Sequence, residues 1–280
     1  MFVSIDWVSF TFEMEEAQSV LGFELWGRAA EELSRQFPLA KQMLIDGWDF
    51  TPKIGRAPYN AAQRRSDNGV TVFAHQRIDH SLVEVGGIGC DTLGSIEAEI
   101  ALIQEVAPRM TRLDVAVDIY TEVLPDEFAP ARSDGRFKSR SEAISPSGHT
   151  VYVGSKSSDR YARVYRYFEP HPRARFLRVE HVLKSEQARE AVKTITEVGL
   201  DAFVAMLGNT FDWAHPAWKP EVNTDEAVKA WTPERRAGRT VLWLHEAVAP
   251  ALKKLVKDGV MTEQDVLRFI NEKVLDKQNE

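Results

Sequence analysis

The sequence predicts an α+β protein, in which an antiparallel β-sheet carries the functional groups and helices pack with it. Two observations lead to this class. The first 184 residues contain several short segments in which apolar and polar residues alternate, as they do in half-buried strands. The residues after 184 instead show the three-to-four-residue apolar spacing of amphipathic helices. A sheet-forming part followed by a helical part is an α+β arrangement.

The part of the chain up to residue 120 is expected to combine strands with two helices. Residues 3–12 alternate like a strand, and residues 15–36 follow with helical spacing. The apolar stripe of that helix consists of Val20, Leu21, Leu25, Ala29 and Leu33. Residues 57–76 have the pattern of a hairpin, because Asp67-Asn68-Gly69 accepts the positive φ of a tight turn. A strand at 81–87, a helix at 92–106 and a strand at 112–120 complete this part.

Residues 121–148 are rich in proline and glycine, so they are expected to be mostly loop, with a short helix near 124–131. Strands should then recur at 149–154, 160–168 and 175–184. These three segments are rich in tyrosine and valine, which are good strand formers.

After residue 184 the expected helices lie at 185–195, 198–208, 240–257 and 262–276. Pro250 should kink or split the third of them, and Thr262 with Asp265 resembles a capping box before the fourth. Tryptophans and prolines between 212 and 232 indicate a packed connector. We therefore divide the chain into a sheet-based domain at 1–184 and a helical region at 185–280, with the boundary somewhere in 185–230. No internal repeat is visible.

The composition is that of a globular protein without a membrane partner. Hydrophobic residues make up 44% and charged residues 28% of the chain. No apolar run approaches the roughly 20 residues that span a bilayer. The first residues lack a basic n-region and carry Asp6, so they do not form a signal peptide. One cysteine excludes an internal disulfide, and we expect a cytoplasmic protein.

Charge is distributed unevenly along the chain. The net charge is −7, but residues 136–184 contain eleven Lys and Arg against four Asp and Glu. The remaining residues therefore carry about −14. Because electrostatic fields are local and screened within about 8–10 Å, an acidic protein with one basic face can still bind phosphate there. Such a protein should have low non-specific affinity and strong salt sensitivity.

Tyrosines, arginines and carboxylates share single faces of three predicted strands. Residues two apart in a strand point to the same side of the sheet. The shared faces hold Tyr161, Arg163, Tyr165 and Tyr167 in 160–168, Asp114 and Asp118 in 112–120, and Arg178 and Glu180 in 175–184. If these strands are neighbours, the groups converge on one surface.

This set of groups suits transfer of a phosphoryl group to tyrosine. A tyrosine hydroxyl, with a pKa of about 10, is a poor nucleophile at neutral pH. A divalent cation held by carboxylates would polarise a phosphate, and arginine would bind its other oxygens. Oxygen ligands with few imidazoles favour Mg²⁺ or Mn²⁺. The candidate metal ligands are Asp114, Asp118 and Glu180.

Each group also has a simpler interpretation. Tyrosines in a strand pack more often than they react. Aspartate is depleted in strands, so Asp114 and Asp118 fit a functional site and a structural ion pair about equally. Lys156 and Arg160, in the segment GSKSSDR, form either an ordinary polar turn or a phosphate-positioning loop.

Several stretches resemble the replication initiation factor family, the trans-acting initiators of rolling-circle replication in plasmids, with relatives in filamentous phages and conjugative elements. The resemblance is carried by GHTVYVGSKSSDRYARVYRY with FLRVEHVLK, and by SIDWVSFTF, VEVGGIGCDTL and TRLDVAVDIY in the same order. It covers roughly residues 3–184, and the combination is specific although no single stretch is.

The resemblance implies a DNA endonuclease that nicks and rejoins a specific site through a 5′-phosphotyrosine intermediate, with a divalent metal. Tyr165 is the expected nucleophile, because the family places a tyrosine after an Arg-apolar pair such as Arg163-Val164. Tyr161 is the second candidate. The three carboxylates named above match the family's acidic positions, and the resemblance suggests a homodimer.

The expected function is therefore initiation of rolling-circle replication on single-stranded DNA or an extruded origin hairpin, with a host helicase as a candidate partner. The expected DNA-binding residues are Lys156, Arg160, Arg166, Arg178 and Lys184. A conjugative relaxase would use the same chemistry. The alternatives from other classes are a non-catalytic DNA- or RNA-binding regulator, whose exposed tyrosines stack bases, and a structural sheet whose Asp–Arg contacts are ordinary ion pairs.

Overall fold

The computed structural model of the chain consists of two compact units, residues 1–233 and 234–280. The structure describes residues 1–14, 31–40, 50–54, 58–59, 61–65, 70–74, 80–91, 93–130, 139–169, 173–219, 231 and 249–270. Each unit is considered by itself below.

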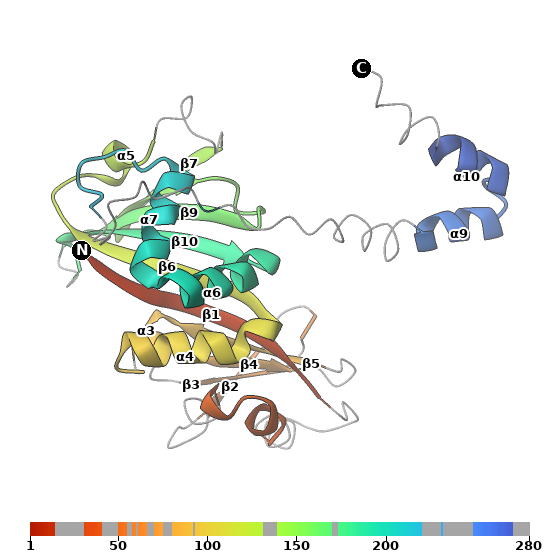
Figure 1. Cartoon of the computed structure of the whole chain (residues 1–280), viewed down its shortest axis with the longest axis horizontal. Helices are drawn as coiled ribbons and strands as arrows, with labels where there is room; N and C mark the ends of the chain where they lie inside the picture. The colour runs from red at the N-terminus through yellow and green to blue at the C-terminus, as the bar shows by residue number, and fades with distance from the viewer. Residues whose placement is uncertain are drawn as a thin grey trace. The chain divides into compact units, whose positions relative to one another are not determined.

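The first unit is built on one antiparallel sheet (Figure 1). Within the described residues its strands lie in the order β2-β3-β4-β5-β1-β6-β10-β9-β8-β7. They are β1 (Phe2–Glu13), β2 (Phe50–Ile54), β3 (Ala61–Arg65), β4 (Thr71–Ala74), β5 (His80–Gly86), β6 (Met110–Tyr120), β7 (Arg140–Ser145), β8 (Gly148–Val153), β9 (Arg160–Tyr167) and β10 (Phe176–Lys184).

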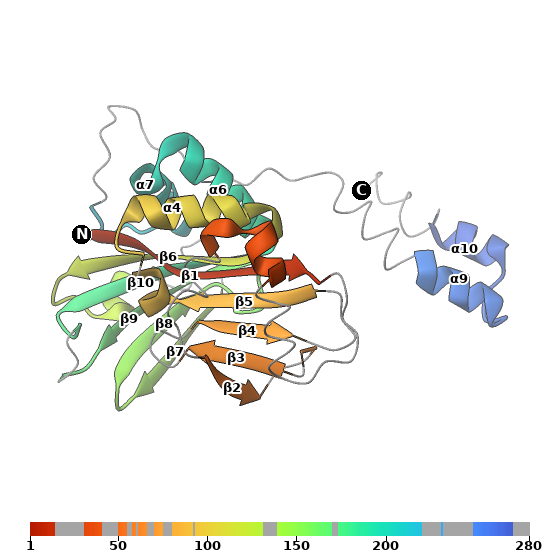
Figure 2. The same ribbon diagram turned by 90° about the horizontal axis from the view of Figure 1, so that it is seen from below.

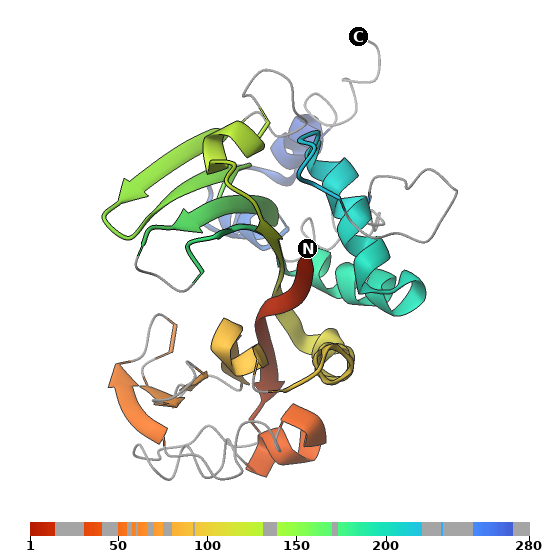
Figure 3. The same cartoon turned by 90° about the vertical axis from the view of Figure 1, so that its left-hand side faces the viewer.

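This strand order is a topological repeat. In each half a first strand, β1 or β6, is followed by a meander of four strands whose last member, β5 or β10, returns to pair with it. The two first strands pair with each other at the centre of the sheet. Figure 3 shows the two meanders on opposite sides of β1. The sequence showed no repeat, because the halves share topology and not side chains.

Helices cover one face of the sheet (Figure 2). They are α4 (Ile96–Val106), α6 (Glu186–Val198) and α7 (Leu200–Phe211). Alternate residues of the central strands, such as Val115, Val117 and Val179, are fully buried beneath them. Because side chains alternate, the residues between these valines point to the other face, which is where the charged groups lie.

The predicted elements are largely confirmed where the structure describes them. The strands expected at 3–12, 81–87, 112–120, 149–154, 160–168 and 175–184 are present, as are a hairpin of β3 and β4 and a short helix, α5 (Pro125–Phe128). Residues 15–30 of the first predicted helix lie outside the described residues, as does the turn at 67–69. Residues 31–36 are helical.

Three elements differ from the prediction. β2 lies in a stretch for which no element was predicted, and it pairs with β3. β7 lies in the stretch expected to be loop, and its residues are mostly exposed, so they show no apolar alternation and owe their strand structure to pairing with β8. A short helix, α3 (Gly87–Asp91), follows β5 directly.

The helices α6 and α7 also belong with the sheet and not with a separate C-terminal region. The first unit extends to residue 233, just past the predicted boundary range of 185–230, and the buried faces of both helices pack on the sheet. Trp213 and Trp231, in the predicted connector, are buried within this unit as well.

The second unit contains α9 (Ala249–Lys257) and α10 (Glu263–Ile270). The predicted capping box is present: Asp265 N donates to Thr262 Oγ1 at 3.1 Å, and Thr262 N donates to Asp265 Oδ2 at 3.0 Å. Pro250 lies in the first turn of α9, where a missing N–H is tolerated. The predicted kink involves residues 240–248, which lie outside the described residues. In the part of the chain that the structure describes, no helix is long and apolar enough to span a membrane.

A glycine in α7 makes room for the connector. A Cβ on Gly208 would lie 2.2 Å from Trp218 Nε1. Glycine normally weakens a helix by about 0.5–1 kcal/mol relative to alanine, so its presence here is explained by the indole that packs against it.

We expect Gly208→Ala to destabilise the protein by about 1–3 kcal/mol, because the new methyl group overlaps the Trp218 indole. Urea unfolding followed by far-UV circular dichroism measures this. In the Trp218→Ala background the same substitution should cost little or should stabilise the helix. An unchanged or higher midpoint for Gly208→Ala in the otherwise native chain would contradict the proposed overlap.

Candidate active site

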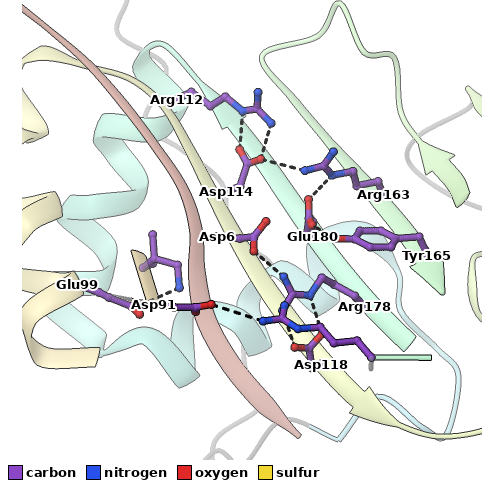
Figure 4. Close-up of polar contacts among 12 residues, drawn as sticks. Asp6, Asp91, Glu99, Arg112, Asp114, Asp118, Arg163, Tyr165, Arg178 and Glu180 are labelled. Carbon is purple, nitrogen blue, oxygen red and sulfur yellow. Dashed lines mark hydrogen bonds and ion pairs between the residues drawn. The ribbon is translucent and has the colours of Figure 1, made fainter. Parts of the chain in front are cut away.

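Four adjacent strands carry the candidate site on the sheet face away from α4, α6 and α7. In the register of β9, β10 and β6, Glu180 lies between Arg163 and Ala116. Arg178 lies between Tyr165 and Asp118 in the same way. The predicted convergence of tyrosine, arginine and carboxylates on one surface is therefore present (Figure 4).

Glu180 is the centre of this surface. Its side chain is fully buried and accepts hydrogen bonds from Tyr165 Oη and from Arg163 Nε. Burial, together with the nearby negative charge of Asp6, raises the pKa of Glu180 to about 7. Burial and the Glu180 carboxylate also raise the pKa of the Tyr165 hydroxyl well above its usual value, so Tyr165 is neutral at physiological pH. Of the two candidate nucleophiles, Tyr165 is the one bonded to a carboxylate.

Asp114 is held by a second arginine. Arg112 Nε and Nη2 donate to its two oxygens at 2.8 and 2.5 Å, and Arg163 Nη2 lies 3.7 Å from Oδ2. Asp114 is fully buried, and this burial raises the pKa of its carboxyl despite the two arginines. The Arg112 guanidinium lies 4.9 Å from the Trp7 ring centroid, so it is also placed by a cation–π contact.

Arg178 joins two carboxylates. Its Nε and Nη2 donate to Asp118 at 2.7 and 2.6 Å, and its Nη1 donates to Asp6 Oδ1 at 2.6 Å. Asp6 was not among the predicted site residues. The signal was present, because the argument that singled out Asp114 and Asp118, the scarcity of aspartate in strands, applies equally to Asp6 in β1.

A β-bulge brings Asp6 into the site. The pairing of β1 with β6 shifts register between Ile5 and Trp7, so Asp6 is the extra residue. The freed N–H of Ile5 donates to Glu99 Oε2 on α4 at 2.9 Å. On the other side, a Cβ at Gly87 would lie 2.7 Å from Asp6 Oδ1, so glycine allows the carboxylate its position.

The three predicted metal ligands do not form a ligand cluster as they are placed. Each carboxylate already has protein partners. Arg112 donates to both oxygens of Asp114, and Arg178 donates to both oxygens of Asp118. Arg163 and Tyr165 donate to Glu180. Among the described residues no group of three or more His, Cys, Asp or Glu side chains is arranged to hold a metal ion. A divalent cation would have to displace a guanidinium from one of these carboxylates.

The predicted DNA-binding residues lie on both faces of the sheet. On the site face, the Lys156 ammonium lies 3.5 Å from the Tyr152 ring centroid and the Lys184 ammonium 5.0 Å from that of Tyr161. Arg178 is engaged by carboxylates, as described above.

Two of the predicted DNA-binding residues, Arg160 and Arg166, lie on the face of the sheet opposite to the candidate site. Arg166 is buried and donates to the carbonyl of Thr121, and Arg160 lies over the ring of Trp231, which packs against Phe203 of α7. Both have even numbers in β9, so they point away from Tyr165, toward the helical side. The structure therefore places both side chains away from Tyr165 and Glu180, and their role in phosphate binding stays a prediction.

Comparison with solved structures supports the fold. The chain is similar to the rolling circle replication initiator protein from Geobacillus stearothermophilus, with a TM-score of 0.50 and 21% sequence identity over 83% of this chain and 92% of that chain. The two chains share a fold. The family resemblance seen in the sequence is thus confirmed at the level of the fold. No family model matches the sequence, and no curated protein matches it.

Within this initiator-like fold, the two halves of the sheet are chemically unequal. Glu84 is the fifth residue of β5, as Glu180 is of β10. Its neighbour on β4 is Thr71, where Glu180 has Arg163 on β9. Phe73 and Leu82 of the first half pack in an apolar cluster with Tyr59. Apart from Asp6 of β1, the described groups of the candidate site therefore lie in the second half.

The buried carboxyl of Glu180 should make stability depend on pH. In the folded state its pKa is about 7, above the 4.5 of an exposed glutamate, so the unfolded state ionises first as pH rises. The contribution of Glu180 to stability is therefore fully present below pH 4.5 and is lost as the pH rises to about 7. Glu180→Gln should make the free energy of unfolding fall less between pH 5 and 8, measured by urea titration. Glu99, with a pKa also near 7, leaves a residual slope. Equal slopes for the variant and the wild type would contradict the raised pKa.

Proposed function

We propose that this protein initiates rolling-circle replication by nicking and rejoining DNA at a specific site through Tyr165. One observation carries the proposal: the Tyr165 hydroxyl donates to a buried carboxylate, Glu180, whose pKa of about 7 suits a general base. The fold shared with a rolling circle replication initiator supports the same activity. The sequence resemblance supports it independently.

The proposed chemistry is a transesterification. Tyr165 Oη attacks the scissile phosphorus while its proton passes to Glu180, and the bond from phosphorus to the 3′-oxygen breaks. The departing 3′-oxygen takes a proton from solvent, leaving a 3′-hydroxyl and a 5′-phosphotyrosine. In the joining step the oxygen of a 3′-hydroxyl attacks the phosphotyrosine and its proton passes to solvent. The bond from phosphorus to Tyr165 Oη breaks, and Glu180 returns its proton to that oxygen. Arg163, bonded to Glu180, holds the base in place and is the nearest cation for the phosphate.

Electrostatics limit how a phosphate can enter. The site contains the carboxylates of Asp6, Asp114, Asp118 and Glu180 and the guanidinium groups of Arg112, Arg163 and Arg178. With every group charged, the carboxylates exceed the guanidiniums by one. This excess negative charge would repel a phosphate and would favour a bound cation. It therefore supports the proposal that the site binds Mg²⁺ or Mn²⁺. Homodimerisation, a helicase partner and a cytoplasmic location are likewise proposals.

We expect wild-type protein to form a covalent adduct with single-stranded oligonucleotides, and Tyr165→Phe to form none while still binding DNA. The reason is that phenylalanine lacks the oxygen that attacks phosphorus. A denaturing gel of protein incubated with an oligonucleotide library and Mn²⁺ measures this. Tyr161→Phe is the matched control and should retain the adduct.

Other outcomes would reassign the function. Adducts that survive in Tyr165→Phe and disappear in Tyr161→Phe would move the nucleophile. DNA binding without any wild-type adduct would instead indicate a non-catalytic regulator. The cleaved sequence, read from the adduct, would distinguish a replication origin from a conjugative transfer origin.

We expect adduct formation to stop when EDTA removes divalent cations and to return with Mg²⁺ or Mn²⁺. In free protein Mn²⁺ should bind weakly, because guanidinium groups occupy the carboxylates. Electron paramagnetic resonance of free Mn²⁺, with and without an oligonucleotide, measures the binding. Undiminished adduct formation in EDTA would show that the reaction needs no divalent cation.

A further inference from the structure

Three aromatic rings are gathered at one end of the site face. Phe2 begins β1, Tyr120 ends β6 and Phe176 begins β10, so the three lie at the same end of the sheet (Figure 1). Phe176 contacts both of the others, with ring centroids 6.4 Å from Phe2 and 5.7 Å from Tyr120, in edge-to-face geometry. Phe2 is 68% and Tyr120 66% exposed. We call these three residues the aromatic platform.

The aromatic platform adjoins the proposed catalytic groups. Along β10, Phe176 and Arg178 are two residues apart and share a face, and along β6 so do Tyr120 and Asp118. Phe2 pairs directly with Asp118. Two residues of a strand span about 7 Å, so the platform lies one such step from the Arg178–Asp118 pair. The Tyr165 ring lies across from Arg178 in the same register.

The chemistry of the platform fits an unpaired base. Exposed aromatic rings offer flat faces and edges that stack with any nucleobase, whatever its identity. In a duplex those base faces are covered by neighbouring base pairs, so only an unpaired or splayed base can use them. The platform is also continuous with a charged surface, which suits a polymer in which bases alternate with phosphates.

We propose that the aromatic platform stacks one or two unpaired DNA bases beside the phosphate that Tyr165 attacks. This proposal rests on the proposed function. It extends that function by assigning a subsite that selects single-stranded DNA as the substrate. Phe2, Tyr120 and Phe176 are binding residues in this assignment, and none takes part in the bond changes.

The test measures binding of full-length protein to a fluorescein-labelled 20-nucleotide DNA strand of mixed sequence by fluorescence anisotropy. Phe2→Ala and Tyr120→Ala should each weaken binding about tenfold, the scale of one lost base stack. Tyr120→Trp should retain affinity and Tyr120→Leu should not, because leucine keeps apolar area without a π-face. Ile144→Ala, a 73% exposed position on the edge strand β7, is the matched control and should bind as the wild type. Thermal unfolding verifies that each variant is folded.

An abasic strand of the same length separates stacking from phosphate binding. It should bind wild type and Phe2→Ala equally. Full affinity of both alanine variants for the mixed strand, or no single-strand binding by wild type, would overturn the platform. Tighter binding of an RNA strand of the same sequence would also overturn it as a DNA subsite. Failure of the proposed nicking function would give a different result: wild-type protein would bind the strand through the platform but would form no covalent adduct.

Discussion

The burial of the Glu180 carboxylate is the constraint on which the arrangement of the site depends. A carboxylate removed from water needs charged or hydrogen-bonding partners, because an unpaired buried charge is very costly. Arg163 and Tyr165 supply them from the neighbouring strand. The same requirement applies to Asp114, which Arg112 and Arg163 satisfy. The result is a connected network of charged groups in which the Tyr165 hydroxyl donates a hydrogen bond to Glu180.

Local backbone irregularity adds the last members of this network. The bulge in β1 turns Asp6 toward Arg178. The backbone N–H of Ile5, next to the bulge, donates a hydrogen bond to Glu99 of α4. Gly87 leaves space for the Asp6 carboxylate. Bulges often re-aim a side chain near functional sites, and here the bulge at Asp6 places its carboxylate on Arg178. The negative charge of Asp6 then helps to hold the pKa of Glu180 near neutrality.

The two topologically similar halves of the sheet carry different side chains on the site face. Both halves offer a meander whose last strand returns to the centre, so both present a similar open face. In the first half that face packs Phe73 and Leu82 into an apolar cluster, whereas in the second it pairs charges. The aromatic platform lies where β1 of one half meets β6 and β10 of the other. Among the described residues, the two halves thus share a topology but differ in the side chains that they place on this face.

The sequence by itself determined most of the strands. It also determined that Tyr165 and Arg163 lie on one face of their strand, and that Asp114 and Asp118 lie on one face of theirs. These follow from the two-residue period of a strand, which is local to each segment. Only the tertiary structure decided that Asp6 joins the site, that arginines occupy the predicted metal ligands, and that the fold repeats. Strand order, register and charge pairing depend on contacts between residues far apart in the chain, such as the 172 positions between Asp6 and Arg178, and no local pattern contains them.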